Sequence, residues 1–481
     1  MFSLFSTSTT NESIKLYNSA SKKAEVFRPF KKGQVTIYSC GPTVYDHIHI
    51  GNLRAYLLPD LLQRLFLYHG YTVKLTINFT DFGHLSDDGD AGEDKMMKGM
   101  KRDGYPITMD AMREFATPFI ESFKRDNAAF GNLPATYYTR ASDYVREQIK
   151  LVETLMQKGY AYETSDGVYF DIAKFPKYGV LGNVDIEKMK AGARVEVNPE
   201  KRHPADFALW KKAPLGWKST WGTGFPGWHI ECTAMAFATL GKQVDVHTGG
   251  EDLKYTHHNA EIAQAECVTG KSYVHYWLHN AHVTIENEKL AKSAGNGLRL
   301  MELSAKGYTA LEYRYWLLQS HYRSGANFSF TALDAAKQAL TRLQRFVYFD
   351  LEGVKPTRLS AVYEARITDA MGNDLDTPAA LAALWDLVKD ERVTPGEKLA
   401  TIIAADSLLS LGLSLHPDEG KAMLGYVAEN ELPEEIVGLI DEREAARVAR
   451  NWPEADRLRE LITAKGYSLE DTAEGPKVSR L

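Results

Sequence analysis

The first readable pattern in the chain is a short apolar strand followed by an apolar stripe of helical spacing. Residues 35–39 (VTIYS) predict a strand, and the apolar spacing from about Leu53 predicts a helix that Gly70 ends. A second strand is expected over 72–78 (TVKLTIN). Strand, helix and strand in this order form the unit of a doubly wound parallel sheet, so this part is expected to be α/β.

The pattern changes after the second predicted strand. A helix is expected from an N-cap at Ser142 to Gly159, followed by a strand over 167–171. The Trp-containing run 206–228 indicates loops, and the sheet pattern resumes at 243–247 (QVDVH). We interpret the intervening part as an insertion in the sheet domain.

Helical periodicity dominates beyond Phe328. One apolar stripe is made of Leu333, Ala336, Leu340, Leu343 and Val347. Three or four such helices are expected to about residue 428. Two more are expected near 436–450 and 453–464, so a largely helical region follows the α/β part.

Composition fits a globular protein of several domains. The chain has 481 residues, 44% of them hydrophobic and 25% charged. A net charge of −6 means that any surface for nucleic acid must be local. No apolar run approaches the roughly 20 residues that span a bilayer, and the first 15 residues lack the features of a signal or transit peptide. We therefore expect no membrane association and a cytoplasmic location.

The cysteines and one histidine–glutamate pair suggest a metal. Cys40, Cys232 and Cys267 are odd in number and far apart, which argues against a disulfide framework. On a helix His257 and Glu261 share a face, and with Cys40 and Cys232 they would complete a tetrahedral Zn²⁺ shell. The alternative is that both cysteines are small buried apolar residues. Cys267 is interpreted as a packing residue.

Two further stretches could bind phosphate. His49, Gly51 and Asn52 lie where a strand hands over to a helix, whose free N–H groups favour anions. The alternative there is an ordinary helix cap. Lys289 and Lys292 lie on a small-residue loop and could clamp a pyrophosphate, or the loop could simply be charged and solvated.

Taken together, these segments resemble the class I cysteinyl-tRNA synthetases. The matching segments, in order, are CGPTVYDHIHIGN, GWHIEC, HTGGEDL with HHNAEIAQAE, and KLAKS, joined by DFALWK, WLHNAHV and LEDTAEG. The resemblance implies a Rossmann-type catalytic domain with a connective insertion, followed by an α-helical bundle and a small terminal module. The implied domains are 1–120 (catalytic domain, first half), 121–224 (connective insertion), 225–284 (catalytic domain, second half with the zinc ligands), 285–327 (lysine loop and stem-contact region), 328–428 (helical bundle) and 429–481 (anticodon-binding module).

The resemblance also implies an activity. It is the ATP-dependent ligation of L-cysteine to tRNA(Cys) through a cysteinyl-adenylate, with ATP used together with Mg²⁺, by a chain expected to be a monomer. One Zn²⁺ per subunit would be held by Cys40, Cys232, His257 and Glu261. Cavity shape discriminates small groups by only roughly 1–3 kcal/mol. A soft ion that binds the substrate thiolate separates cysteine from serine by far more.

The resemblance assigns roles to further residues. Stabilisation of the transferring phosphate falls to His49, Asn52, Lys289 and Lys292. The amino-acid pocket would be lined by Thr43, Thr80 and Trp228. ATP would be bound by Gly41, Gly51, Gly250, Asp252 and Lys292. The tRNA would be contacted by Arg443, Arg447, Trp452, Asp456, Arg459 and Asp471. A tryptophan flanked by arginines suits an unpaired base, although an amphipathic helix with solvated charges is the alternative.

Three segments depart from the family pattern, and two other functions stay open. KLAKS replaces KMSKS, HHNAE replaces HHENE, and a longer acidic run, DFGHLSDDGDAGEDK, follows Thr80. One alternative is a related zinc-dependent ligase that joins cysteine to an amino sugar, against which the tail 436–481 argues. The other is a catalytically silent zinc-binding relative, against which the retained His49, Lys292 and ligand residues argue.

Overall fold

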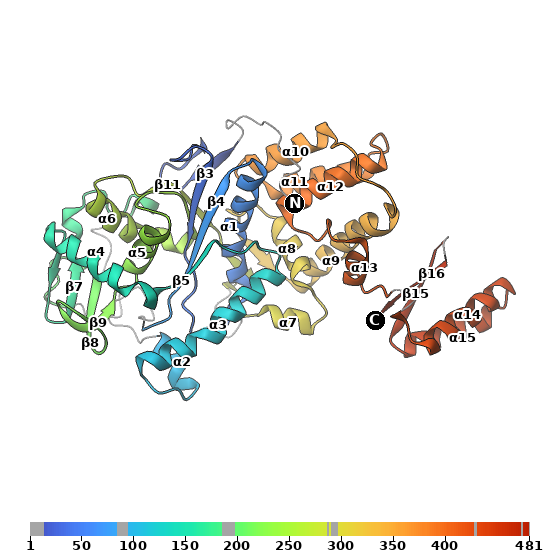
Figure 1. Cartoon of the computed structure of the whole chain (residues 1–481), viewed down its shortest axis with the longest axis horizontal. Coiled ribbons are helices and arrows are strands. Elements are labelled where there is room, and N and C mark those ends of the chain that lie inside the picture. Colours follow the sequence, from blue (N-terminus) through green and yellow to red (C-terminus); the bar gives the residue numbers. More distant parts are fainter. Residues whose placement is uncertain are drawn as a thin grey trace.

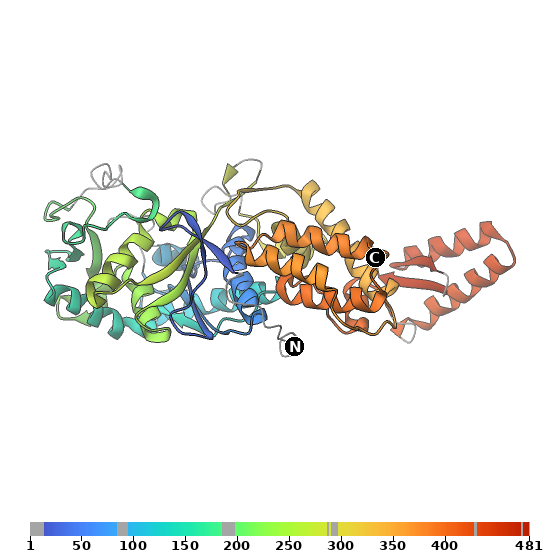
Figure 2. The ribbon, with the colours of Figure 1, turned by 90° about the horizontal axis from the view of Figure 1, so that it is seen from above.

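The chain forms an elongated molecule with its α/β part at one end and a small module at the other (Figures 1 and 2). The computed structural model describes residues 14–83, 95–184, 198–285, 288–289, 297–427, 431–472 and 475–480. A helical region lies between the two ends, as Figure 2 shows from above. None of the described helices is both long and apolar enough to cross a membrane.

A five-stranded parallel sheet forms the centre of the α/β part. Its order is β11 (Val274–Asn280), β10 (Val244–Gly250), β3 (Gln34–Ser39), β4 (Thr72–Phe79) and β5 (Tyr137–Arg140). The predicted strands at 35–39, 72–78 and 243–247 are confirmed. The chain leaves β3 toward β4 on one side, while β10 lies on the other. The carboxyl end of β3 is therefore a topological switch point, where ligands bind in open α/β sheets.

Helices cover both faces of this sheet (Figure 1). On one side lies α1 (Ile50–Tyr68), which is buried along most of its length and contacts β3, β4 and β10. On the other side lie α4 (Val145–Gln157), α5 (Ile230–Thr239) and α6 (His257–Thr269). With helices on both faces, most residues of β3, β4 and β10 are buried, polar ones included.

The expected insertion contains a separate antiparallel sheet. Its strands are β6 (Ala161–Glu163), β7 (Gly167–Phe170), β8 (Phe207–Ser219) and β9 (Gly222–Pro226). The prediction of loops over 206–228 is therefore wrong, because β8 and β9 form a hairpin there. The register between these two strands shifts between Lys212 and Trp217. Pro214 and Gly216 lie in the shifted part, and they interrupt the alternation of apolar and polar residues by which a strand is recognised in a sequence. β5 also falls within 121–224, yet it pairs with β4 of the parallel sheet.

The predicted N-cap at Ser142 is wrong. A 3₁₀ turn, Ala141–Tyr144, precedes α4, which begins at Val145. Ser142 instead donates from its backbone N–H and its hydroxyl to the carboxylate of Asp81, at 2.9 and 2.7 Å. The hydroxyl therefore joins this turn to the segment after β4 and is not used to cap a helix.

The helical region begins with α7 (Leu300–Ala305) and α8 (Ala310–Leu318). It continues with α9 (Phe330–Arg345), α10 (Ala361–Gly372), α11 (Thr377–Lys389), α12 (Pro395–Leu409) and α13 (Pro417–Met423). From 330 to 423 the described chain thus has five α-helices, one more than the upper prediction. The predicted stripe is buried, although Val347 lies in a π turn, Phe346–Asp350, after α9.

Short strands join the parts of the molecule. The N-terminal hairpin is β1 (Lys15–Asn18) with β2 (Lys23–Val26). Between the sheet and the helical region, β12 (Val283–Ile285) pairs with both β13 (Glu288–Lys289) and β14 (Ala326–Phe328). The terminal module contains α14 (Glu434–Val448) and α15 (Trp452–Ala464), which confirms both predicted helices. The hairpin of β15 (Tyr467–Thr472) and β16 (Gly475–Arg480), which was not predicted, packs on them.

Candidate metal centre and active site

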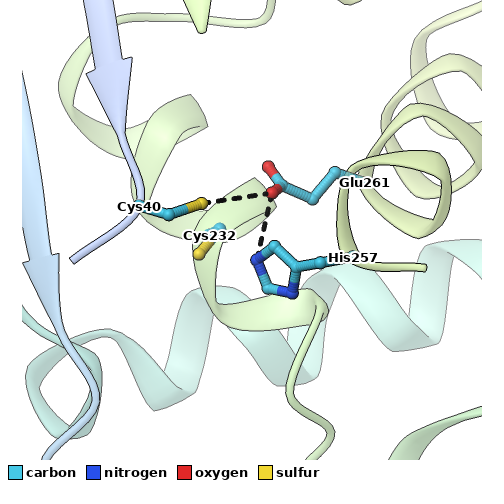
Figure 3. A group of neighbouring side chains, drawn as sticks. All are labelled: Cys40, Cys232, His257 and Glu261. Carbon is cyan, nitrogen blue, oxygen red and sulfur yellow. Dashed lines mark hydrogen bonds and ion pairs between the residues drawn. The ribbon is translucent and has the colours of Figure 1, made fainter. Parts of the chain in front are cut away.

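Four side chains from three segments converge beside the switch point (Figure 3). Cys40 directly follows β3, Cys232 lies in the first turn of α5, and His257 and Glu261 lie one turn apart on α6. Their ligand atoms all lie within 4.8 Å of one another. The Oε1 atom of Glu261 lies 3.8 Å from Cys40 Sγ and 3.2 Å from His257 Nε2. This group can hold a metal ion.

The residues around Cys40 fix its position. The N–H of Cys40 donates to the carbonyl of Thr248 in β10, at 3.3 Å, and the N–H of Gly41 donates to the side-chain oxygen of Asn78, at 2.9 Å. A Cβ atom on Gly41 would lie only 1.5 Å from the carbonyl oxygen of Asn78. Glycine is therefore required at 41 for the chain to pass this close to β4.

Buried neighbours orient the possible ligands. His229 Nδ1 lies 2.9 Å from His257 Nδ1, which leaves His257 Nε2 toward Glu261. The other carboxylate oxygen of Glu261 lies 3.0 Å from His247 Nε2 and accepts a hydrogen bond from the Tyr273 hydroxyl at 3.4 Å. Such outer contacts hold metal ligands in place. From the sequence, no role is assigned to His229, His247 or Tyr273.

Electrostatics favour a cation in this group. A hydrogen bond with Cys40 and the nearby His257 lower the pKa of Cys232 to about 6, against the effect of burial. Burial also opposes ionisation of Glu261, but His247 and His257 lower its pKa to about 2. Burial, together with Cys232 and Glu261, raises the pKa of Cys40 well above its usual value. One thiolate and one carboxylate thus carry negative charge in a buried place. Against the effect of burial, Cys232 and Glu261 raise the pKa of His257 to about 10, so a bound metal would displace the proton of that imidazole.

A second group of donors overlaps the first. Cys40, His247, His258 and Glu261 also present ligand atoms within 4.8 Å of one another. His258 Nε2 lies 3.4 Å from Cys40 Sγ, while its Nδ1 lies 2.8 Å from His279 Nε2. Because the groups share Cys40 and Glu261, they are alternatives. The first group has two thiols and the second only one.

Residues 257–261 read HHNAE where the family usually has HHENE, and this difference does not affect the possible ligands, His257 and Glu261. Asn259 points away from them and exchanges two hydrogen bonds with the backbone of Leu181, each 3.0 Å long. Ala260 is fully buried. Asn259 therefore ties α6 to the insertion, while Glu261 is supported by His247 and Tyr273.

The three residues expected to bind the amino acid lie near the metal group. The backbones of Thr43 and Thr80 pair as a parallel bridge. The Thr80 hydroxyl donates to the buried carboxylate of Glu231, at 2.6 Å, a partner that the sequence pattern did not single out. The Trp228 ring lies with its centroid 4.8 Å from that of the His257 imidazole. The structure thus brings all three beside the candidate ligands.

The described residues among those expected to bind ATP lie at the same edge of the sheet. His49 is the N-cap of α1, and its N–H donates to the Asn52 side chain, at 3.0 Å, while Gly51 lies in the first turn. Gly250 ends β10, and Asp252 follows in a 3₁₀ turn. The amino end of α1 therefore lies where a phosphate group can be bound.

The lysine loop is only partly described. Lys292 lies outside the described residues, as do most of the KLAKS segment and of the acidic run after Thr80. Lys289 is seen as part of the strand β13, opposite Thr284 of β12. Where the described chain resumes, the carbonyl of Leu298 accepts a hydrogen bond from the N–H of Ile50, at 2.8 Å. The segment after the lysines thus touches the start of α1.

The residues expected to contact tRNA differ in exposure. Arg443 is buried and forms two hydrogen bonds with Asp471, at 2.8 and 2.9 Å, and Arg447 bonds the same carboxylate. Arg459 donates to the carbonyl of Leu469, at 3.0 Å. Asp456 lies on α15, and Trp452, at its start, is 57% exposed. Trp452, Asp456 and Arg459 are thus exposed, and Trp452 is the only aromatic side chain of this set.

Comparisons with known proteins agree with the fold. Residues 26–338 match the family described as "tRNA synthetases class I (C) catalytic domain". A solved methionyl-tRNA synthetase from Mycobacterium tuberculosis, bound by methionyl-adenylate, shares the fold with a TM-score of 0.57 at 13% identity. The match covers 84% of this chain and 95% of that one. Fold and family match are those of a class I tRNA synthetase.

Curated relatives are similar along nearly the whole chain. "Cysteine--tRNA ligase 1" of Burkholderia lata is 42% identical over 472 residues, covering 97% of this chain and 96% of the relative. "Cysteine--tRNA ligase" of a strain of Thermus thermophilus is 38% identical, covering 96% of this chain and 98% of the relative. The chain belongs to the cysteine–tRNA ligase family.

Proposed function

We propose that this chain ligates L-cysteine to tRNA(Cys) in a reaction driven by ATP. Cysteine carboxylate would attack the α-phosphate to give cysteinyl-adenylate and pyrophosphate. A hydroxyl of the terminal adenosine of the tRNA would then attack the cysteinyl carbonyl, which forms the ester and releases AMP. The single observation that carries the proposal is the group Cys40, Cys232, His257 and Glu261 at the switch point of the sheet, in which Cys40 is half-buried and the other three are buried. Similarity over 97% of the chain to a cysteine–tRNA ligase supports it.

We infer that this group holds one Zn²⁺ per subunit. Two sulfur donors, one imidazole and one carboxylate suit a tetrahedral zinc site, and the low pKa of Cys232, about 6, supplies a thiolate. We favour this group over the one with His247 and His258, because two thiols suit a soft metal better than one. When bound, the ion would supply a ligand position that prefers a substrate thiolate over a hydroxyl.

Protein groups beside the ion would hold the rest of cysteine. The Thr80 hydroxyl proton is engaged by Glu231, which leaves the lone pairs of its oxygen free to accept a hydrogen bond from the cysteine ammonium. Thr43 lies beside Thr80, and the half-buried Trp228 ring would cover the small side chain and exclude water. Together they would place the carboxylate of cysteine toward the amino end of α1.

The phosphate chemistry would depend on positioned positive charge. His49 and Asn52, at the start of α1, would contact the triphosphate, and Gly51 would let the backbone approach it. Gly41, Gly250 and Asp252 would bind the nucleotide at the same sheet edge. Lys289 and Lys292 would balance the charge that develops as pyrophosphate leaves, and Mg²⁺ would accompany ATP.

We further propose that the terminal module, 429–481, reads the anticodon. Its exposed Trp452 would stack on an unpaired base. Arg443 would act indirectly, because its buried pair with Asp471 holds α14 against β15. Arg447, Asp456 and Arg459 would lie around the base.

A direct assay separates this function from its alternatives. A transcript of tRNA with the cysteine anticodon is incubated with ATP and either cysteine or serine, and the metal content of the protein is measured. The proposal predicts charging with cysteine only, by protein that contains zinc. Ligation of cysteine to an amino sugar but not to tRNA would favour the other ligase, which the full-length relatives do not favour. Absence of any cysteine-dependent reaction with ATP would contradict both.

A further inference from the structure

A cluster around Asp374, far from the metal group, links the helical region to the start of α1. Asp374 lies in the turn between α10 and α11 and is buried. The loop that it faces, residues 320–324, connects α8 to β14 and is called the clamp loop below. No catalytic, substrate-binding or metal-binding role assigned above falls on Asp374 or on residues 320–324.

Asp374 forms hydrogen bonds with the clamp loop through both its side chain and its backbone. Its carboxylate accepts hydrogen bonds from the Tyr322 hydroxyl, at 2.7 Å, and from Arg323 Nε, at 2.8 Å. Its carbonyl oxygen lies 2.9 Å from His321 Nε2. Burial and the carboxylate raise the pKa of Tyr322 well above its usual value, so the hydroxyl keeps its proton and donates. Three successive residues of the clamp loop thus depend on one aspartate.

The same aspartate also binds the N-terminal strand. The N–H of Tyr17 donates to its carboxylate, and its own N–H donates to the carbonyl of Lys15, both at 2.8 Å. Asp374 and the fully buried Leu375 both adopt a left-handed backbone, with φ of 58° and 57°. Leucine rarely takes this conformation, so the surrounding contacts must hold the turn in place.

On its other side the clamp loop holds α1. Arg54 lies two residues after Asn52 and is buried. Its guanidinium donates to the carbonyls of His321, at 3.0 Å, and Ser324, and to the Ser320 hydroxyl at 3.2 Å. The first turn of α1, which carries the residues expected at the triphosphate, is therefore tied to the clamp loop.

The clamp loop also fixes the strand that leads toward the first lysine. The carbonyl of Tyr322 accepts a hydrogen bond from the N–H of Ala281, at 2.9 Å, and Ala326 donates to the carbonyl of His282 at 3.2 Å. From there β12 runs parallel to β14 and pairs with β13, which contains Lys289. One loop thus contacts the supports of both phosphate-binding elements.

We propose that Asp374 is a positioning residue for adenylate formation: by clamping residues 320–324 it sets the distance between the first turn of α1 and the strand that carries Lys289. The inference rests on the proposed function, because the step that it serves is the attack on ATP. Misplacement of reacting groups by about 1 Å can slow a reaction about 100-fold. Loss of the clamp therefore lowers the rate of the step without removing any group that touches substrate.

The test compares Asp374→Asn and Asp374→Ala with Asp376→Ala. Asp376 lies in the same turn and caps α11 through Ala379 N. Among the described residues its side chain forms no hydrogen bond with the clamp loop, and it acts on His321 only through a minor electrostatic interaction. Active sites are counted by the burst of adenylate, and kcat and KM are then measured in cysteine-dependent ATP–pyrophosphate exchange. We expect kcat per active site to fall about 10- to 100-fold in the Asp374 variants, with KM for cysteine and zinc content unchanged. Asp376→Ala is expected to lose stability only.

A second readout does not depend on activity. Amide hydrogen exchange is measured on the wild type and on the same variants, and Arg54→Lys tests the clamp from its other end. Faster exchange in 50–54, 281–285 and 320–324 is expected for Asp374→Ala and Arg54→Lys but not for Asp376→Ala. Equal kcat per active site in Asp374→Ala and Asp376→Ala, or unchanged exchange in these segments, would overturn the inference. Wild-type protein without cysteine-dependent exchange of pyrophosphate would instead overturn the proposed function, and this inference with it.

Discussion

The Sγ atom of Cys40 lies 3.8 Å from the Oε1 atom of Glu261, although 221 positions separate the two residues. Cys40 directly follows β3, and Glu261 lies in the second turn of α6, the helix that follows β10 in the chain. Their contact therefore depends on the pairing of β3 with β10 in the parallel sheet. The candidate metal group is thus a product of the whole sheet and not of one local segment.

Removal of one sulfur ligand should abolish the selection of cysteine. In Cys232→Ser the hydroxyl is a poor ligand for zinc, so zinc content should fall. Loss of a residue that only supports a metal ligand lowers activity roughly 10- to 100-fold. Loss of the ligand itself should lower cysteine-dependent ATP–pyrophosphate exchange by more than that. Cys267→Ser is the matched control, because Cys267 is also buried but belongs to neither donor group. Normal exchange and normal zinc in Cys232→Ser would show that this thiol is no ligand.

A methyl group at residue 41 should disrupt the site without touching a ligand. In Gly41→Ala the new Cβ would meet the Asn78 carbonyl oxygen at 1.5 Å, so β3 and β4 must move apart. We expect a loss of about 1–3 kcal/mol in the free energy of unfolding, together with a fall in zinc content. Thermal unfolding and elemental analysis measure the two effects.

Gly438→Ala provides the control for this substitution. Gly438 lies within α14, and a Cβ there has no neighbour within 4 Å among the described residues. Alanine in a helix is about 0.5–1 kcal/mol more stable than glycine. The control should therefore unfold no more easily than the wild type, and equal destabilisation of both variants would refute the steric argument.

The buried charges around Asp60 should matter for stability. Burial acts to raise the pKa of Asp60, but Arg64 and Arg314, at 3.0 and 2.5 Å, outweigh it and lower the pKa. Asp60→Asn would leave Arg314 buried without its partner. We expect the free energy of unfolding to fall by about 3–5 kcal/mol at pH 7, as measured by urea denaturation.

This stabilisation should depend on pH with a defined sign. The folded-state pKa of Asp60 lies below the unfolded value of about 3.9. The stabilisation that ionised Asp60 provides is therefore fully present at a pH well above the unfolded pKa. It is lost as the pH falls through the lowered folded-state pKa. The difference between wild type and Asp60→Asn should shrink in acid. A difference that grows as the pH falls would contradict this assignment.

The exposed tryptophan of the terminal module should act on tRNA alone. Stacking of one base on an aromatic ring contributes about 1–3 kcal/mol, so Trp452→Ala should raise KM for tRNA(Cys) about 5- to 150-fold. Pyrophosphate exchange, which needs no tRNA, should be unchanged. Val448→Ala is the control, since Val448 is 87% exposed in the same module but has no ring. An unchanged KM for tRNA in Trp452→Ala would exclude stacking.

The sequence predicts β3, β4 and β10 of the central sheet, because their β-branched and aromatic residues favour strands, but it does not predict β5 and β11. The sequence also predicts the helices α9, α14 and α15, because their apolar residues recur at helical spacing. It fails at β8 and β9, where proline, glycine and a register shift break the alternation. It also fails at Ser142, whose hydroxyl is taken up by Asp81, a residue 61 positions away.

The residues of the candidate site were likewise predicted only in part. Cys40, Cys232, His257 and Glu261 could be named because their residue types and spacing indicate a ligand set. Glu231 and Tyr273 could not, since a lone glutamate or tyrosine next to a strand or helix carries no signal of its own. The partner of Glu231, Thr80, is 151 positions away, and that of Tyr273, Glu261, lies on a different element 12 positions away. The contacts of Asp374 with Tyr17 and Tyr322 are hidden for the same reason.

The account depends most on direct bonding between the substrate sulfur and a metal ion held by this chain. The measurement is the absorption spectrum of protein in which Co²⁺ replaces the bound metal, titrated with cysteine and, separately, with serine. Cysteine should strengthen the sulfur-to-cobalt charge-transfer band, because one more thiolate joins the two from the protein, and serine should leave the band unchanged. An identical spectrum with and without cysteine, in protein that still activates cysteine, would contradict the account.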